Sequence, residues 1–370
     1  MSVILPVSFN NKPCYNILIE KDYEKFYEEV QKFDILNRRL CIVTETNVGP
    51  HYANQLRDRL AGLCKEVYIF TFDAGESSKN LDVVYKLYEF LIQNKFDRKD
   101  VLIALGGGVV GDLTGFTAAT YLRGIRFIQM PTSLLSQVDS SIGGKTGVDF
   151  NGYKNMVGAF YQPILVYINI ETLKTLPIRE YLSGMGEIIK HGFIKDKGYL
   201  KWLNDNSEHI LNLEYDALEY MICESCMIKR AVVEYDPKET LGERALLNFG
   251  HTLGHAIEKN SNFSLLHGEC IALGMLAALE ISYTKGYINE KDLEFSKSII
   301  RKYNLPTTVE GLSKTEVVEA TKSDKKMEAD AIKFILLKSL GNAIIDTSVS
   351  IEEMLSLIHI SEPTRPRLIS

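Results

Sequence analysis

The stretch Val101-Leu102-Ile103-Ala104-Leu105-Gly106-Gly107-Gly108-Val109-Val110-Gly111-Asp112 decides the fold class of this 370-residue chain. Its five apolar residues predict a buried strand, and a helical pattern follows at 113–121. Gly106, Gly108 and Gly111 have the G-x-G-x-x-G spacing, which lets a phosphate reach the backbone N–H groups at a helix N-terminus. The pattern therefore predicts a nucleotide-binding turn. A tight turn that requires positive φ is the simpler alternative.

Strand and helix patterns alternate on both sides of this stretch. Strands are expected at 3–9, 15–20, 39–44, 66–72, 126–130 and 164–170, and helices at 22–33, 51–63 and 80–94. The first two strands should form a hairpin, and helices between the later strands imply right-handed crossovers and a parallel sheet. We predict an α/β nucleotide-binding domain with a parallel sheet over residues 1–176.

Helical patterns dominate the second half of the chain. They are expected at 180–195, 213–233, 243–259, 267–285 and 292–303, followed by a hairpin at 331–337 and 343–349. This predicts a mainly α-helical domain over 177–357. Residues 358–370 follow neither the helical nor the strand period, so we expect an irregular tail that is not native to the protein.

Composition excludes several classes of protein. The chain is 45% hydrophobic and 24% charged, as is usual for a globular protein. Its net charge is −6, and the sequence has no run of basic residues that would suit binding to nucleic acid. It lacks a membrane-length apolar stretch and a signal-peptide pattern at Met1–Pro6, which favours a cytoplasmic location. Cys223 and Cys226 form a CxxC within an apolar helical pattern, so buried thiols are favoured over a redox or zinc site.

Three of the seven histidines gather at His251, His255 and His267. A helix would place His251 and His255 on one face, and His267 could return to the same point. This arrangement is typical of a metal site, but polar histidines buried in a helix are an equal alternative. The zincin motif is absent, since Thr252 stands where that motif requires glutamate.

The segment from Gln137 to Gly147 combines glycine with charge. Gly144-Lys145-Thr146 has the ending of a P-loop, but Asp139 stands where a P-loop requires glycine, which argues against an NTPase. Lysine is suited to binding phosphate, so the segment predicts an anion site. The acidic residue of an ordinary Rossmann ribose contact is missing about 20 residues after the glycines, and Glu45 is the better candidate.

One further pair of charged residues lies in the second half. Glu187 and Lys190 are three residues apart on a predicted helix and would share a face. A surface ion pair is the favoured interpretation from their spacing alone.

These motifs together, in this order, resemble those of the 3-dehydroquinate synthases. The matching segments are Gly106–Asp112, Arg123–Ile125, Pro131-Thr132, Gln137–Ser141, Gly144-Lys145, Lys154-Asn155, Gly186–Lys190, Asn248–Thr252 and His267–Glu269. The resemblance extends from about Val43 to Leu337. It implies an NAD- and metal-dependent lyase of the shikimate pathway with a nucleotide-binding and a helical domain. It also implies that 3-deoxy-D-arabino-heptulosonate 7-phosphate is converted to 3-dehydroquinate and phosphate.

The resemblance also assigns roles to residues of this chain. Metal ligands for Zn²⁺ or Co²⁺ would be Glu187, His251 and His267. NAD would contact Glu45, Asn47, Glu76, Lys79, Gly108, Val109, Asp112, Thr132, Ser133, Lys154 and Thr172. The substrate phosphate would bind Arg123, Lys145, Asn155 and one of Lys325 and Lys326, with Lys326 taken here. The other substrate groups would meet Asp139, Lys190, Lys229, Arg244, Asn248 and His255.

Two residues depart from the family pattern near the dinucleotide. Ala74 replaces a usual proline, and Glu45 stands where aspartate is more common. The family mechanism is a transient oxidation by NAD⁺, phosphate elimination, re-reduction, ring opening and an intramolecular aldol closure. Partners implied by the resemblance are a small sugar phosphate and a second copy of the chain as a homodimer, without nucleic acid or membrane.

Three alternatives remain at this point. A metal-dependent polyol dehydrogenase would share the fold class but has little use for Arg123, Lys145 and Lys154 together. A 2-deoxy-scyllo-inosose synthase is expected to differ at Asp112 and within 138–145. A catalytically silent binding protein would not need every ligand position to be filled.

Overall fold

The computed structural model describes residues 2–9, 12–261, 264–321, 327–328, 331–357 and 360–361. Their contacts divide the chain into two compact units: residues 1–177 with 213–238, and residues 178–212 with 239–370. The predicted division lay at 176/177 and placed the helix at 213–233 in the second domain. That helix, α8 (Tyr215–Tyr235), instead belongs to the first unit, where it packs on strand β1 and on the short helix η3 (Ser136–Ser140).

The first unit is organised on a sheet whose strand order, among the described residues, is β1-β2-β9-β6-β5-β3-β4. The strands are β1 (Val3–Phe9), β2 (Lys12–Glu20), β3 (Arg39–Glu45), β4 (Glu66–Phe72), β5 (Val101–Gly106), β6 (Arg126–Pro131) and β9 (Leu165–Asn169). Strands β1 and β2 form the predicted antiparallel hairpin, and the other neighbouring pairs are parallel. The predicted α/β fold with a parallel sheet is confirmed.

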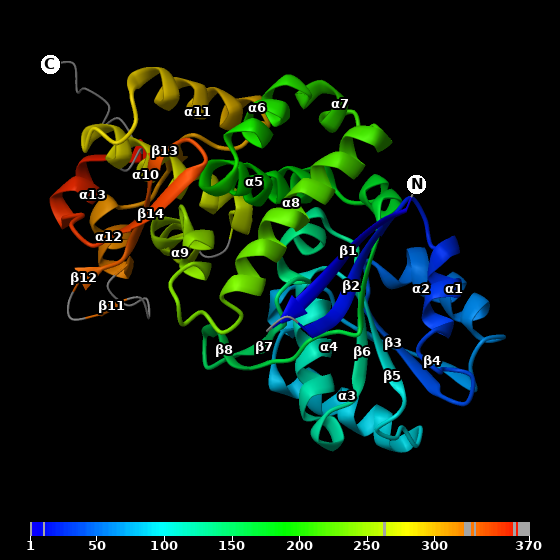
Figure 1. The fold of residues 1–370 in the computed structure, drawn as a ribbon. Helices are drawn as coiled ribbons and strands as arrows, with labels where there is room; N and C mark the ends of the chain where they lie inside the picture. Colours follow the sequence, from blue (N-terminus) through cyan, green and yellow to red (C-terminus); the bar gives the residue numbers. More distant parts are fainter. Residues whose placement is uncertain are drawn as a thin grey trace, which may run out of the picture. The chain divides into compact units, whose positions relative to one another are not determined.

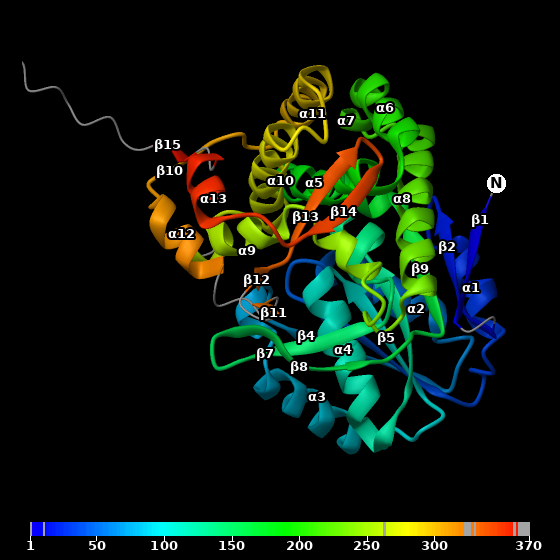
Figure 2. The same cartoon turned by 60° about the vertical axis from the view of Figure 1, so that its left-hand side comes forward.

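Helices cover both faces of this sheet, as Figures 1 and 2 show. The helices are α1 (Glu24–Gln31), α2 (Gly49–Leu60), α3 (Leu81–Gln93) and α4 (Gly108–Thr120). Side chains alternate along a strand, so Leu40 and Ile42 of β3 face the core formed with α1 and α2. Cys41 and Val43 face the core formed with α3 and α4. Burial on both faces explains the continuous apolar runs of these strands.

Chain order reverses beside β3. After β4 the chain returns to form β5 on the other side of β3, then continues outward to β6. Parallel sheets bind ligands at the carboxyl ends of strands where such a reversal leaves a crevice. The glycine run that decided the fold class follows β5, and therefore lies at this switch point.

The glycine run itself differs from its prediction. Helix α4 begins at Gly108, five residues earlier than predicted, so the run forms the first turn of the helix. A Cβ at Gly111 would lie 2.7 Å from Oε1 of the Gln129 side chain on β6. Close packing of helix on strand therefore explains this glycine. The hairpin of β7 (Lys145–Phe150) and β8 (Tyr153–Phe160) was not predicted.

The second unit is mainly helical, as predicted. It contains α5 (Ile178–Lys195), α6 (Lys197–Asp205), α7 (Ser207–Leu211), η5 (Arg244–Asn248), α9 (His251–Asn260), α10 (His267–Thr284), α11 (Glu290–Lys302), α12 (Lys314–Thr321) and α13 (Ile351–Leu357). The continuous helix predicted at 243–259 is wrong. The backbone leaves the helical region at Phe249 and Gly250, where Gly250 has a φ of 80°, so α9 starts at His251.

The late hairpin is confirmed with shorter bounds. Strands β13 (Phe334–Ser339) and β14 (Asn342–Asp346) pair antiparallel, while β12 (Ala331–Ile332) pairs with β11 (Met327–Glu328). In the predicted tail, β15 (Ile360–Ser361) pairs with β10 (Val309–Glu310), so these two residues are not irregular. Residues 358–359 and 362–370 lie outside the described residues.

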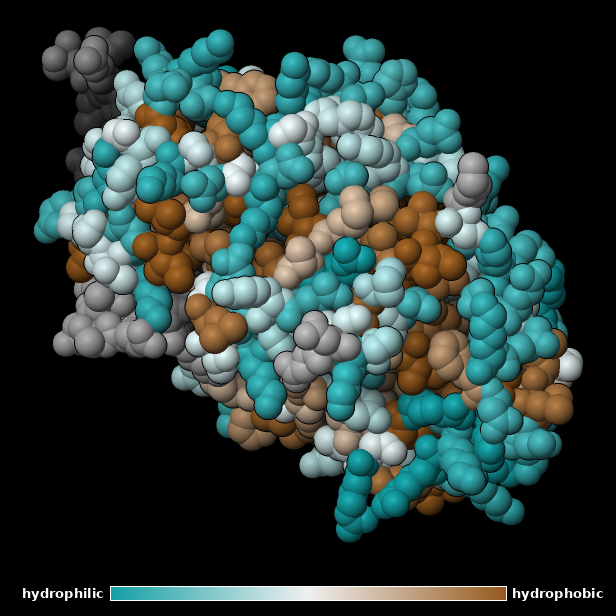
Figure 3. All heavy atoms as spheres, viewed as in Figure 1, coloured by the Kyte–Doolittle hydropathy of each residue, from teal (hydrophilic) through white to brown (hydrophobic). Residues whose placement is uncertain are grey.

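Hydrophilic residues cover the outer helices of each unit, with hydrophobic residues in smaller patches (Figure 3). Exposed apolar side chains such as Ile4 (52%) and Tyr153 (63%) are of the kind that most protein surfaces carry. No helix within the described residues has the length and apolar character to cross a membrane.

Gly274→Ala tests the packing of α9 on α10. A Cβ at this position would lie 1.9 Å from the main-chain oxygen of Gly250, and neither backbone can move without shifting a helix. We expect a loss of about 1–3 kcal/mol in the free energy of unfolding, measured by urea denaturation. Gly62→Ala is the control, because nothing lies within 4 Å of its Cβ position. A Gly274→Ala protein as stable as the control would contradict the close approach.

Candidate functional site

All the predicted dinucleotide contacts except Lys154 lie at the carboxyl ends of five parallel strands; Lys154 is exposed on β8, in the separate β7–β8 hairpin. Each strand is succeeded by one group: Glu45 and Asn47 for β3, Glu76 and Lys79 for β4, Gly108, Val109 and Asp112 for β5, Thr132 and Ser133 for β6, and Thr172 for β9. Parallel strands end at one edge of their sheet, so the fold gathers these residues there. The N-terminus of α4 lies at the same edge and presents main-chain N–H groups to an anion.

Lys79 joins three predicted site residues. Its Nζ lies 2.6 Å from Asp112 Oδ2, donates to Asn155 Oδ1 at 2.6 Å, and lies 3.9 Å from Glu76 Oε1. Burial disfavours the ammonium ion, but the neighbouring carboxylates outweigh it and raise the pKa of Lys79. Lys79 is therefore a cation that holds Asp112, and with it the first turns of α4, against the loop after β4.

Glu45 and Thr172 are engaged within the protein. Glu45 accepts hydrogen bonds from the main-chain N–H groups of Asn47 (2.5 Å) and Val48 (3.0 Å), so its carboxylate orders the turn before α2. The Thr172 hydroxyl donates to the Asn169 carbonyl at 2.8 Å and lies 3.1 Å from Gln137 Nε2. Both residues shape the strand ends, whatever further contact each makes with a ligand.

Predicted substrate residues of the first unit lie in two places. Lys229 of α8 donates to Asp139 of η3, which brings together two residues that are 90 apart in sequence. Arg123 and Lys145 are exposed, and Arg123 has a φ of 65° within a left-handed turn. Asn155 also has a positive φ, and its N–H donates to Asp149 Oδ1 at 2.8 Å. Such uncommon backbone geometry is frequent where a side chain must be aimed at a ligand.

A second cluster, in the helical unit, combines one carboxylate with two imidazoles. Nε2 of His251 lies 3.6 Å from Glu187 Oε1, and Nε2 of His267 lies 3.7 Å from the same oxygen. One ligand atom from each residue lies within 4.8 Å of the others. Around tetrahedral zinc, with bonds of about 2.0–2.2 Å, donor atoms lie roughly 3.3–3.6 Å apart. The donor set and its spacing therefore fit Zn²⁺ or Co²⁺.

Glycines beside the three ligands allow the helices to meet. A Cβ on Gly186 would lie 2.7 Å from the Gly268 carbonyl oxygen, and one on Gly268 would lie 1.8 Å from the Ser183 carbonyl oxygen. Helices α5 and α10 therefore contact backbone to backbone next to Glu187 and His267. Gly250 places the start of α9 equally close to α10, since its Cβ would lie 2.8 Å from the Ile271 carbonyl oxygen.

The opposite nitrogen of each imidazole faces an oxygen of the protein. His251 Nδ1 lies 3.2 Å from the Phe249 carbonyl, and His267 Nδ1 lies 3.5 Å from Glu258 Oε2. Burial disfavours the imidazolium of His267, but hydrogen bonds to Glu187 and Glu258 outweigh it and raise the pKa of His267 to about 9. Two carboxylates thus favour positive charge at this ring. Glu258 was not predicted from the sequence, in which its one signal is its place seven residues after His251.

Lys190 and His255 lie beside this cluster. The Lys190 ammonium donates to Glu187 Oε2, and both side chains are almost fully buried, so the predicted surface ion pair is wrong. The His255 ring centre lies 5.1 Å from that of His251 and 5.9 Å from that of His267. His255 is not in the group formed by Glu187, His251 and His267. Arg244 is buried in η5, which ends at Asn248, and Lys326 lies outside the described residues.

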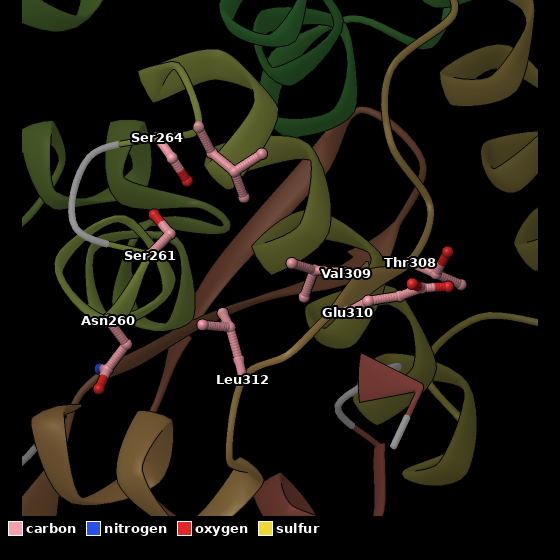
Figure 4. Close-up of a pocket in the computed structure, with 8 residues that line it drawn as sticks. Asn260, Ser261, Ser264, Thr308, Val309, Glu310 and Leu312 are labelled. Atoms are coloured by element: carbon pink, nitrogen blue, oxygen red, sulfur yellow. The ribbon is translucent and has the colours of Figure 1, made fainter. Parts of the chain in front are cut away.

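A separate pocket of about 440 Å³ lies beyond the C-terminal end of α9 (Figure 4). Among the described residues, small polar and aliphatic side chains line it, and Glu310 is the one charged residue of that lining. No predicted site residue within the described part of the chain contributes to it. The described lining includes no cation for a phosphate, so it gives no support for binding of the predicted substrate there.

Glu269 secures the start of α10, next to His267. Its carboxylate accepts the N–H of Leu266 at 2.8 Å and binds Arg179 of α5 through both oxygens at 2.8 and 2.7 Å. Burial opposes the charge, but Arg179 and the Leu266 N–H outweigh it and lower the pKa of Glu269. The contacts of the Glu269 carboxylate with Arg179 and Leu266 therefore stabilise the fold at pH values above the usual pKa of a glutamate. This stabilisation is lost as the pH falls through the lowered pKa of Glu269.

Glu269→Gln should therefore reduce the free energy of unfolding by about 0.5–1 kcal/mol at pH 7, because glutamine can still accept the Leu266 N–H but lacks the charge that pairs with Arg179. The deficit should shrink as the pH is lowered below 4, because the wild-type carboxyl then also loses its charge. Urea denaturation at both pH values measures it. Glu294→Gln, at a side chain 57% exposed, is the control. If the difference in free energy of unfolding between the wild type and Glu269→Gln did not change with pH, the charge of Glu269 would not be what stabilises this contact.

Two family models together match most of the chain. A model described as 3-dehydroquinate synthase N-terminal matches residues 69–183, and one described as 3-dehydroquinate synthase C-terminal matches residues 184–327. A 3-dehydroquinate synthase from Acetivibrio thermocellus is 44% identical over 344 residues, which cover 93% of this chain and 95% of the relative. These matches span both units of the fold.

Solved structures share the fold at lower identity. A 2-deoxy-scyllo-inosose synthase complexed with carbaglucose-6-phosphate, NAD⁺ and Co²⁺ is 24% identical, with a TM-score of 0.86 over 96% of this chain and 99% of its own. A 2-epi-5-epi-valiolone synthase from Streptomyces hygroscopicus with NAD⁺ and Zn²⁺ bound is also 24% identical, with a TM-score of 0.86 over 95% and 98%. At this identity the likeness concerns the fold.

Proposed function

The chain belongs to the 3-dehydroquinate synthase family, and we propose that it converts 3-deoxy-D-arabino-heptulosonate 7-phosphate to 3-dehydroquinate and phosphate. The reaction runs through transient oxidation by NAD⁺, elimination of phosphate, re-reduction, ring opening and intramolecular aldol closure. The observation that carries this proposal within the molecule is the group of Glu187, His251 and His267, of which the first two are buried. The same chain also has a parallel sheet whose carboxyl edge is of the kind that binds dinucleotides.

The first unit binds NAD⁺ at the carboxyl edge of its sheet. The glycine run leaves the N-terminus of α4 open to the pyrophosphate, and Asp112, which pairs with Lys79, lies about one turn along this helix. The remaining predicted contacts from Glu45 to Thr172 follow neighbouring strand ends, except Lys154, which reaches the cofactor from β8. NAD⁺ in two solved structures with this fold supports the assignment. NAD⁺ bound there would supply the hydride acceptor for a transient oxidation.

The helical unit binds the divalent metal through Glu187, His251 and His267. The three donors suit Zn²⁺ or Co²⁺, and three protein ligands leave a coordination position for substrate, as catalytic zinc sites require. A bound cation of this kind lowers the pKa of a coordinated hydroxyl and so favours its oxidation. Co²⁺ and Zn²⁺ in the two solved structures support the choice of metal.

The chain's own residues bind and orient the substrate. Arg123, Lys145 and Asn155, with Lys326, hold the phosphate, and the positive charges of the arginine and the two lysines stabilise it as it leaves. Asp139 and Lys229, already paired in the first unit, contact substrate hydroxyls and its carboxylate, as do Lys190, Arg244, Asn248 and His255. Lys190 also holds Glu187 Oε2, which leaves Oε1 directed to the two imidazoles.

The alternatives have less support. A 2-deoxy-scyllo-inosose synthase shares the fold at 24% identity, whereas 3-dehydroquinate synthases reach 44% over nearly the whole chain. A polyol dehydrogenase would produce net NADH. We also propose a homodimer and a cytoplasmic location, both of which follow from the family and remain predictions.

One assay separates these activities. Protein incubated with the heptulosonate phosphate, NAD⁺ and Zn²⁺ or Co²⁺ should release one phosphate per substrate without lasting absorbance at 340 nm, because the hydride returns to the product. Phosphate and absorbance are followed together. Omission of metal or of NAD⁺ is the control and should abolish release. Net NADH formation with simple polyols, and no phosphate release, would overturn the proposal.

His251→Ala tests the metal centre directly. Removal of one of three ligands should leave far less than one zinc per chain after dialysis, measured by atomic absorption, while the circular dichroism spectrum is retained. His209→Ala is the control, since His209 lies on α7 and is not in the ligand group. Unchanged zinc content in the His251→Ala protein would remove that residue from the ligand set.

A further inference from the structure

Two histidines of the proposed metal centre present the same nitrogen to the same point. Nε2 of His251 and Nε2 of His267 both lie near Glu187 Oε1, at 3.6 and 3.7 Å. A neutral imidazole carries one N–H and one lone pair, so a ring can bind a metal through Nε2 only if its proton is on Nδ1. The tautomer of each ring is therefore decided by what faces Nδ1.

The two rings differ in what faces that nitrogen. His251 Nδ1 meets the main-chain carbonyl of Phe249, while His267 Nδ1 meets the carboxylate of Glu258. A carbonyl or carboxylate oxygen only accepts hydrogen bonds, so each favours the Nδ1–H tautomer. Once a metal ion takes the place of a proton at Nε2, the two rings are thus held in the form whose Nε2 lone pair is available. Only the partner of His267 can be changed by mutation.

Glu258 is a buried carboxylate on α9, only 7% exposed. Burial of a carboxylate is costly unless hydrogen bonds or opposite charge compensate it. Two helical turns separate it from His251, so α9 contributes both a ligand and, on the same face, the partner of a second ligand.

We propose that Glu258 is a positioning residue of the metal centre, which accepts the Nδ1–H of His267, fixes its tautomer and aims Nε2 at the ion. The inference rests on the proposed metal site. Carboxylate partners of this kind also make the imidazole a stronger donor, and their loss typically weakens metal binding by 10–100-fold. Glu258 itself does not bind the ion.

A second interpretation uses the same residues differently. His255, Glu258 and His267 also offer ligand atoms within 4.8 Å of one another, which could hold another cation. Such an ion would need Nδ1 of His267 while Nε2 serves the first ion, so the ring would have to lose both protons. Neutral imidazole has only one lone pair, which favours a hydrogen bond at Nδ1. Metal stoichiometry distinguishes the two interpretations.

The test compares three variants in the full chain. Glu258→Leu removes the acceptor but keeps the volume, and Glu258→Gln keeps an acceptor oxygen but removes the charge. Glu280→Gln is the matched control: it lies on α10 beside Lys297, about 20 Å along the helix from His267. Zinc dissociation constants come from competition with a chromophoric chelator. The His267 tautomer comes from ¹⁵N chemical shifts of the zinc-loaded protein.

We expect zinc binding about 10–100-fold weaker in Glu258→Leu, an intermediate loss in Glu258→Gln, and no change in Glu280→Gln. The Nδ1–H signal of His267 should persist in wild type and Glu258→Gln and be lost or shifted in Glu258→Leu. One zinc per chain is expected throughout. Wild-type affinity in Glu258→Leu, or a second zinc that disappears with Glu258, overturns the inference. Failure of the wild-type chain to bind zinc would instead contradict the proposed metal site.

Discussion

The helical unit depends on the close approach of α5 and α9 to α10 at positions where no side chain could fit. Gly186 and Gly268 bring α5 onto α10, and Gly250 and Gly274 do the same for α9. Each metal-ligand candidate is adjacent to one of the first three of these glycines, so the contact that packs the helices also assembles the donor group. Donors a few tenths of an ångström too far apart would not close around one ion. The glycines that allow the helices to pack closely therefore also set the distances between the three donor atoms.

Buried charge is managed in the same way in both units. Lys79 pairs with Asp112, Lys229 with Asp139, and Lys190 with Glu187, and every member of these pairs is a predicted binding residue. An isolated buried charge would cost several kcal/mol, so each residue is compensated by another of the same site. A bound ligand would then add to these ion pairs or replace one partner in them, while the fold keeps the remaining side chains in place.

Much of this architecture could be predicted from local patterns. The strand at β4 was predicted with its observed bounds, and the helix at 80–94 was predicted to within its capping residues Asn80 and Asn94. Predictions failed where distant residues decide the outcome. Gly250 interrupts the helix expected at 243–259 because α10 lies against it, and α8 joins the first unit through contacts with β1 and η3. The β7–β8 hairpin was missed because its strands carry glycine and lysine rather than an alternating apolar pattern.

The sequence by itself determined the α/β character of the first unit, the glycine turn after β5, and, through its order of motifs, the family. These depend on short-range periodicity and on residue types at fixed spacing. Residue spacing did not determine which groups meet; the resemblance implied the ligand group, and the tertiary structure brings its members together. Spacing suggested that His251 and His255 act together because they share a helix face, whereas Glu187 completes the group with His251 and His267 from another helix. The tertiary structure also places Glu258 beside Nδ1 of His267. It buries the Glu187–Lys190 pair, which was predicted to lie on the surface. The physical reason is that burial and donor distances depend on helix packing, which no local pattern encodes.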